Sequence, residues 1–162
     1  MQTFTIDRDQ YQEIQLTKPG EYTVELVGEG AQATITGVWD ARGKDVVSVT
    51  VIIHHKAPNT RAQTTLHGVG RDTSFVRFVG RIIIEPNCGN SNSFLTERVL
   101  LLSDTARAET VPDLEIHTDD VKCSHAASIS RIPEQQLFYL QSRSIARATA
   151  EDMIVAGFLE LA

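Results

Sequence analysis

The sequence predicts a mainly β fold, and three observations support that prediction. Residues 46–53 are so dense in β-branched side chains that a strand is favoured over a helix. Residues 81–84 and 99–102 are nearly continuous apolar runs, which suit strands covered on both faces. No Asn-Gly hairpin turn is present, which weakens the case for a meander of tight hairpins. These patterns favour a β-solenoid, with a sandwich or a barrel as alternatives, although no clean repeat period is visible.

Strand candidates follow one another from about residue 20 to residue 129, and we assign 1–130 to the β core. The first candidate alternates cleanly between apolar and polar side chains, as a strand with one buried face does. Pro58 and Asn59 break the chain after the β-branched run, and turns rich in Gly, Asn and Asp separate the later candidates. The candidates are, in order, residues 21–27, 32–39, 46–53, 62–69, 74–84, 98–102, 114–117 and 122–129.

The end of the chain changes to a helical pattern, and we assign 131–162 to two short helices. Pro133 suits the first turn of a helix, and Thr149 followed by Asp152 is typical of a helix N-terminus. These helices either cap the open end of the core or form a docking surface for a partner.

Apolar side chains on the two helices are the candidate partner-binding residues. Ile154, Phe158 and Leu161 form one stripe at helical spacing. The candidates are Leu137, Phe138, Tyr139, Ile154 and Phe158.

Length and composition indicate one domain in a protein of ordinary globular composition. The chain has 162 residues and a net charge of −6, and its basic residues are scattered, which argues against nucleic-acid binding. No apolar run approaches the roughly 20 residues that cross a bilayer, and no secretory signal is visible. We therefore expect a cytoplasmic protein with reduced cysteines.

A thiol and an imidazole stand two residues apart in the last strand candidate. Because side chains alternate along a strand, Cys123 and His125 point to the same face. Sulfur and nitrogen ligands side by side suit iron or zinc. The alternative is a small buried cysteine beside a hydrogen-bonded strand histidine. Cys88, in a loop rich in Gly and Asn, is a weaker candidate for a second thiolate.

Other polar features point less clearly to a site. His54 and His55 are adjacent, so on a strand they face opposite sides and cannot both bind one metal ion. The glycine pairs near residues 28 and 68 lack the Gly-Lys-Ser/Thr that completes a phosphate loop, so we expect no ATP hydrolysis by the chain itself. A hydrolase using Cys123 and His125 is a further alternative, but no third orienting group is suggested.

Roughly residues 20–162 of the chain resemble the SufB/SufD family, and the resemblance is closer to SufD. The resemblance rests on LLLSD at 100–104, LEI at 114–116, DDVKCSH at 119–125 and LFYL at 137–140. Weaker similarity extends upstream, to HKAPNTR at 55–61 and FVGRI at 78–82.

The resemblance implies a right-handed parallel β-helix with a C-terminal helical segment. It also implies a scaffold or accessory subunit of the SUF iron–sulfur cluster assembly machinery, which is not an enzyme on its own. Such subunits pair through their β-helices, here as a homodimer or with a SufB/SufD-like paralogue. Their C-terminal helices dock the ABC-type ATPase SufC, so that ATP acts only through the partner. Cys123 and His125 would lie near the subunit interface as ligands of a transient iron–sulfur cluster.

Several departures from the family pattern affect the expected partners more than the fold. Ala126 and Ser144 stand where the pattern has glycine, and residues 92–98 depart from the usual asparagine-containing segment. The family's longer N-terminal region is missing, so we expect a bare core. A metal-free structural module that dimerises and docks the ATPase is the alternative function.

Overall fold

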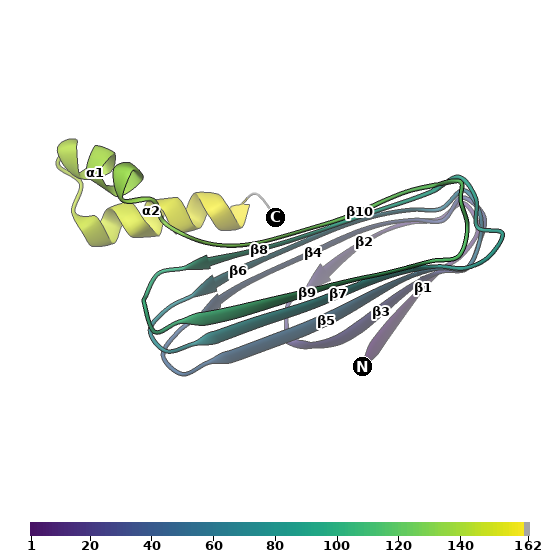
Figure 1. Ribbon diagram of the computed structural model, residues 1–162, viewed down its shortest axis with the longest axis horizontal. Helices are drawn as coiled ribbons and strands as arrows, with labels where there is room; N and C mark the ends of the chain where they lie inside the picture. Colours follow the sequence, from purple (N-terminus) through teal and green to yellow (C-terminus); the bar gives the residue numbers. More distant parts are fainter. Residues whose placement is uncertain (161–162) are drawn as a thin grey trace.

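The computed structural model describes residues 1–160, and its strands form two parallel five-stranded sheets (Figure 1). Successive strands alternate between the sheets, whose orders are β1-β3-β5-β7-β9 and β10-β8-β6-β4-β2. This is the winding of a β-solenoid, so the predicted fold class is confirmed. The strands are β1 (Gln2–Ile6), β2 (Tyr11–Leu16), β3 (Gly20–Leu26), β4 (Gln32–Ala41), β5 (Val46–His55), β6 (Arg61–Gly70), β7 (Phe75–Ile84), β8 (Ser91–Leu101), β9 (Arg107–Ile116) and β10 (Val121–Arg131).

The repeat missing from the sequence is present in the structure, but its length varies. Hydrogen bonds between adjacent windings show this variation. The backbone N–H of Gly43 donates to Oδ2 of Asp72, 29 residues later, whereas Nε of Arg77 donates to Oε2 of Glu109, 32 residues later. The pairing of Gln2 with Tyr22 shows that the first turn is shorter still. Insertions in the loops therefore hide the period from a search at fixed spacing.

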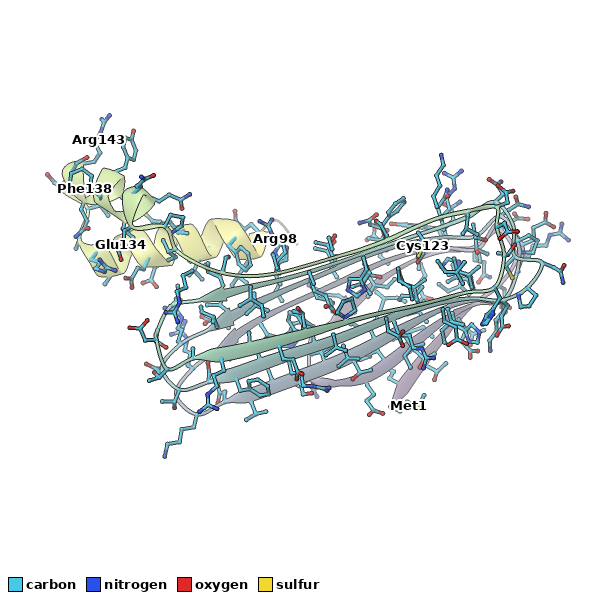
Figure 2. All side chains as sticks on the ribbon, viewed as in Figure 1. Met1, Arg98, Cys123, Glu134, Phe138 and Arg143 are labelled. Carbon is cyan, nitrogen blue, oxygen red and sulfur yellow. The ribbon has the colours of Figure 1, made fainter. Side chains whose placement is uncertain are left out.

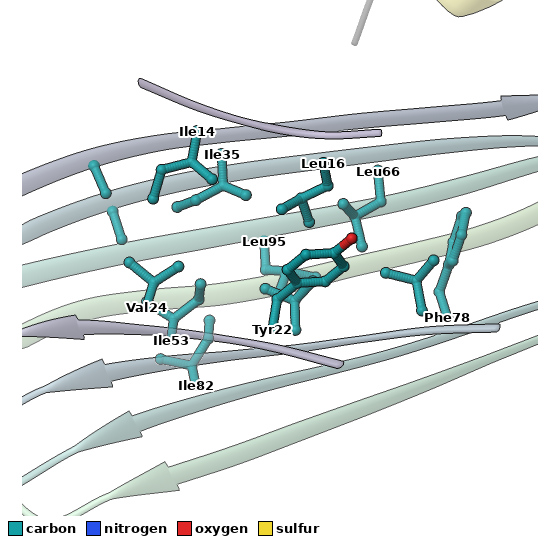
Figure 3. Packing of buried hydrophobic residues seen from close by; sticks show 14 of the residues in the cluster. Ile14, Leu16, Tyr22, Val24, Ile35, Ile53, Leu66, Phe78, Ile82 and Leu95 are labelled. Carbon is teal, nitrogen blue, oxygen red and sulfur yellow. The ribbon is translucent and has the colours of Figure 1, made fainter. Parts of the chain in front are cut away.

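The core lies between the two sheets and is built from alternate residues of each strand (Figure 3). On β5 every second side chain from Val47 to His55 is buried, and the residues between them are only partly covered. The fully buried side chains of Ile53, Phe78 and Ile82 face those of the opposite sheet. Strict alternation of this kind fixes which side chains of every later strand point inward.

Stacked polar turns hold successive windings in register. Asn59 and Asn90 adopt φ values of 62° and 54°, a left-handed conformation that asparagine tolerates better than most residues. The side-chain amide of Asn90 donates to Oδ1 of Asn59 at 2.7 Å. The amide of Asn59 in turn donates to Oε1 of Glu29 at 3.0 Å. The turns thus form a hydrogen-bonded ladder along one side of the solenoid.

Some strand boundaries differ from the prediction. Strands β1 and β2 precede residue 20, β8 begins at Ser91 rather than at residue 98, and β9 begins at Arg107 rather than at residue 114. The inner face of β8 begins with the buried polar residues Ser91 and Ser93. Because these inner residues are polar, the start of β8 lacks the alternation of apolar and polar residues by which a strand is recognised in a sequence.

Two helices follow the strands, α1 (Glu134–Ser142) and α2 (Arg147–Glu160). Pro133 precedes α1 as its N-cap residue, but α2 begins at Arg147, so the predicted start at Thr149 is wrong. Leu161 lies outside the described residues. Neither helix, over the part of the chain that the structure describes, is long and apolar enough to cross a membrane.

Helix α2 lies against the outer face of one sheet and α1 packs on α2 (Figure 1), so the helices do not cap the end of the core. The Phe158 ring of α2 stacks on the His67 ring of β6, with centroids 4.7 Å apart. His67 Nδ1 also lies 2.8 Å from the carbonyl oxygen of Phe158. Val155 is buried with Val69 and Leu100 in a small second core. The last turn of the solenoid therefore remains uncovered by the helices.

Candidate metal centre

Cys123 and His125 share the inner face of β10, the last strand of its sheet. In the parallel pairing with β8, Cys123 is aligned with the buried Ser93 and His125 with the buried Leu95. Lys122 and its alternate neighbours point outward and are exposed. The side chains of the thiol and the imidazole therefore both face the interior of the solenoid, as strand alternation requires.

The imidazole of His125 meets a buried carboxylate that the sequence did not reveal. His125 Nε2 lies 3.3 Å from Oε2 of Glu97, and the two side chains are 2% and 0% exposed. Neither carboxylate oxygen and neither ring nitrogen has a hydrogen-bond partner among the described residues. An ionised pair in such surroundings has lost its water without gaining full compensation from protein groups.

The space for this pair comes from a glycine on the facing sheet. A Cβ atom on Gly80 of β7 would lie 2.7 Å from Glu97 Oε1 and 2.9 Å from His125 Cε1. Both distances are shorter than any normal carbon contact. The missing side chain at Gly80 is thus the cradle in which the carboxylate and the imidazole sit.

Cys123 is partly buried and packs against the edge of the hydrophobic core. Burial raises the pKa of its thiol. A raised thiol pKa is the opposite of what a cysteine nucleophile requires, so the geometry does not favour the hydrolase alternative. Metal binding remains compatible with it, because a metal ion displaces the thiol proton on binding.

The other cysteine lies inside the core. Cys88, in the turn between β7 and β8, is 2% exposed, and its Sγ lies 3.8 Å from the carbonyl oxygen of Pro86. Burial raises the pKa of this thiol as well. Both cysteines are free thiols. Within residues 1–160, no three His, Cys, Asp or Glu side chains are already arranged around one metal position.

The adjacent histidines point in opposite directions, as predicted. His54 faces outward, where its Nε2 lies 2.8 Å from Oε1 of Glu85. His55 faces inward, and its Nδ1 lies 2.7 Å from Oγ1 of Thr60. Burial lowers the pKa of His55 to about 4, so its ring is neutral at physiological pH. The hydrogen-bond partners of the two rings are thus Glu85 and Thr60, and neither ring forms part of the site of Cys123 and His125.

The candidate partner-binding residues divide into two groups. Leu137 is buried and Phe158 packs on β6, so both hold the helices in place. Phe138 is 74% exposed and Tyr139 is also exposed. Figure 2 shows Phe138 and Cys123 toward opposite ends of the molecule. A shallow, mainly apolar groove between the helices is lined by Gln135, Gln136, Tyr139, Leu140 and Ile154.

Glu97 is the residue that sequence reasoning missed. The predicted strand begins at residue 98, so the prediction assigns no inner or outer face to Glu97. The signal was present in the spacing, since Glu97 stands between Leu95 and Val99 with the alternation of a buried strand face.

Comparison with known proteins shows the family to which the chain belongs. Residues 17–158 match the family model described as "SUF system FeS cluster assembly, SufBD core domain". The chain is 36% identical over 139 residues to the iron–sulfur cluster assembly protein SufD of Bacillus subtilis, covering 86% of this chain and 32% of that protein. It is 31% identical to a SufBD family protein of Staphylococcus saprophyticus, over 83% of this chain and 29% of the relative. A Mycobacterium leprae SufBD family protein is 30% identical, with 83% and 36% covered. The chain spans about a third of the length of these relatives, and it belongs to the SufBD family of the SUF iron–sulfur cluster assembly system.

Proposed function

We propose that this chain is a cytoplasmic scaffold or accessory subunit of SufB/SufD type, which receives or hands on an iron–sulfur cluster with a SufC-like ABC ATPase. The observation that carries the proposal is the inward-facing pair of Cys123 and His125 on the last strand of a solenoid of this family. The cluster is the cargo of the machinery. Its sulfur and nitrogen ligands would come from these two residues, and the chain would have no catalytic activity of its own.

The open end of the solenoid supports pairing with another β-helix. Strands β9 and β10 are the edge strands at this end of their sheets, so each has one row of backbone N–H and C=O groups without a strand partner. Leu114, Ile116 and Ile129 are exposed on this last turn, although they have the inward register of the core. A second copy or a SufB/SufD-like paralogue placed here would cover these side chains and enclose Cys123.

The exposed side of the helices supports docking of the ATPase. Phe138 and Tyr139 project from α1, and Ile154 lines the groove beside them. Exposed aromatic side chains beside an apolar groove are typical of protein interaction sites. We therefore assign the proposed docking surface to Phe138, Tyr139 and Ile154, and a structural role to Leu137 and Phe158.

Co-purification with the SufC-like ATPase of the same host tests the proposal. The mass, iron and sulfide of the complex are measured for the wild type, Phe138→Ala and a control, Tyr11→Ala, which removes an exposed aromatic ring from β2. We expect the wild type and the control to hold the ATPase and Phe138→Ala to lose it. A wild-type chain that retains neither the ATPase nor iron contradicts the proposal.

The metal-free interaction module is the second candidate, and the setting of Cys123 favours it. A cysteine that packs against the core and has a raised thiol pKa behaves as a small apolar residue. In that case Cys123→Ser leaves both pairing and ATPase binding unchanged, and no iron is retained by the complex. Iron that depends on Cys123 excludes this candidate.

A further inference from the structure

We propose that Glu97 and His125 form the inner half of an iron(II) site, whose outer ligand is Cys123. The inference rests on the proposed function, because it names the form in which iron would first be held by the same residues. It goes further by giving a ligand role to a carboxylate on β8.

The burial of Glu97 is the first argument. It lies on the inner face of β8, is 0% exposed, and neither of its oxygens accepts a hydrogen bond from a described residue. An ionised carboxylate in a protein interior is strongly destabilising unless a cation or several donors compensate for the lost water. Within residues 1–160 the one charged group in contact with it is His125, so the carboxylate is poised for a cation that is not part of the chain.

The spacing of the two ligand atoms is the second argument. His125 Nε2 and Glu97 Oε2 are 3.3 Å apart, and the contact does not have the alignment of a hydrogen bond. Nitrogen and oxygen ligands bind zinc-like divalent ions at about 2.1 Å, which separates two ligands of one ion by about 3.0–3.4 Å at angles of roughly 90–110°. The observed distance lies within that interval. One divalent ion would satisfy the carboxylate and the imidazole together.

The surrounding space is the third argument. The absence of a side chain at Gly80 gives both groups the room that they occupy, because a Cβ there would lie 2.7 Å from Glu97 Oε1 and 2.9 Å from His125 Cε1. Thr64 and Ser93, on the same inner sheet face, also carry hydroxyl groups without a hydrogen-bond partner among the described residues. The inner face of this sheet therefore carries unpaired polar groups besides Glu97 and His125.

Cys123 lies toward the accessible side of this site. It stands two residues before His125 on the same face of β10, which puts the two Cα atoms about 6.6 Å apart. No three such ligands are grouped around one position within residues 1–160, so binding of the sulfur requires its side chain to rotate toward the ion. The thiol proton then leaves to solvent as the Fe–S bond forms. Carboxylate, imidazole and thiolate together suit iron(II) or zinc better than calcium or magnesium.

Anaerobic titration of the full chain with Co²⁺, a spectroscopic substitute for iron(II), tests the inference. The variants are Glu97→Gln, Cys123→Ser, and Glu109→Gln as a control that removes an exposed carboxylate paired with Arg77. We expect the Co²⁺ affinity to fall by about tenfold or more in Glu97→Gln and to stay unchanged in the control. The sulfur-to-cobalt absorption band should persist in Glu97→Gln at saturating Co²⁺ and disappear in Cys123→Ser.

The outcomes separate this inference from the proposed function. If Glu97→Gln binds Co²⁺ as tightly as the wild type while Cys123→Ser does not, the role of Glu97 is overturned and the proposed function stands. If the wild type binds no Co²⁺ and no iron(II), the inference is overturned, whereas co-purification with the ATPase still tests the function. Should Glu97→Gln fail to fold, Glu97→Leu replaces the buried charge with an apolar side chain of similar size and must show the same loss of affinity.

Discussion

Gly80 and Glu97 face each other across the interior of the solenoid, and the missing side chain of one makes room for the carboxylate of the other. A Cβ atom at position 80 would lie 2.7 Å from Glu97 Oε1 and 2.8 Å from Leu95 Cδ2. The two residues lie on β7 and β8, which belong to different sheets. The polar site thus depends on both walls of the solenoid.

Substitution of Gly80 by alanine should disturb the site without removing any polar group. The added methyl group must displace buried side chains, so we expect a loss of about 1–3 kcal/mol in the free energy of unfolding. Co²⁺ affinity should fall as well, because the carboxylate and the imidazole are pushed apart. Urea denaturation and the anaerobic titration measure the two effects.

Gly157 provides the matched control for Gly80. It lies in α2 with nothing within 4 Å of an added Cβ. Alanine there should stabilise the protein by about 0.5–1 kcal/mol and leave Co²⁺ binding unchanged. Equal effects of the two substitutions on metal affinity would contradict a specific role for the space at Gly80.

Replacement of Ser144 by glycine should stabilise the protein. It links the two helices with a φ of 66°, a left-handed conformation that costs a residue with a side chain roughly 1 kcal/mol. Ser144→Gly is therefore expected to raise the free energy of unfolding by about that amount, measured by urea denaturation. A destabilised variant would mean that the serine side chain makes a compensating contact.

Alanine substitutions of Phe158 and Phe138 should affect different properties, the first stability and the second partner binding. Phe158 stacks on His67 and lies 5.7 Å from the guanidinium of Arg98, so Phe158→Ala should destabilise the protein by about 1–3 kcal/mol. Phe138 is exposed, so Phe138→Ala should change stability by less than about 0.5 kcal/mol and reduce ATPase binding. Thermal unfolding and pull-down measure the two properties. If Phe138→Ala unfolds the helices, its ring is structural and the docking assignment loses its support.

The stability of the protein should fall with acidification because of His55. Its pKa is about 4 in the folded protein, lowered mainly by burial, against 6.5 in the unfolded chain. Between these values the unfolded state binds a proton that the folded state does not, so folding weakens as the pH falls from 6.5 toward 4. The full effect is on the order of 3 kcal/mol.

The comparison with His55→Gln isolates this effect. Burial also lowers the pKa of His67, which acts in the same direction and is common to both proteins. We expect the wild type to lose about 2 kcal/mol more than the variant between about pH 7.5 and about pH 5 in urea denaturation. Identical pH profiles would show that folding does not lower the pKa of His55.

Local patterns predicted a mainly β fold and favoured a solenoid, with a sandwich and a barrel left as alternatives. Alternation along a single strand predicted the shared face of Cys123 and His125. These patterns did not reveal the buried site of Glu97, because that site is formed by contacts with Gly80 in the other sheet and with His125 in the next winding. They also missed how the helices pack, since Phe158 meets His67 across 91 residues of sequence. Contacts between windings depend on loop lengths, which no local pattern encodes.

The measurement that tests the central claim most directly is anaerobic reconstitution of the chain, together with its partner ATPase, with iron and sulfide. Cluster absorbance, iron and sulfide are recorded for the wild type, Cys123→Ser and His125→Asn. Cys88→Ser serves as the control, since that cysteine is packed in the core. The account predicts a cluster in the wild type and the control and its loss in the other two variants, with the complex intact. A cluster that forms equally well without Cys123 and His125 would contradict it.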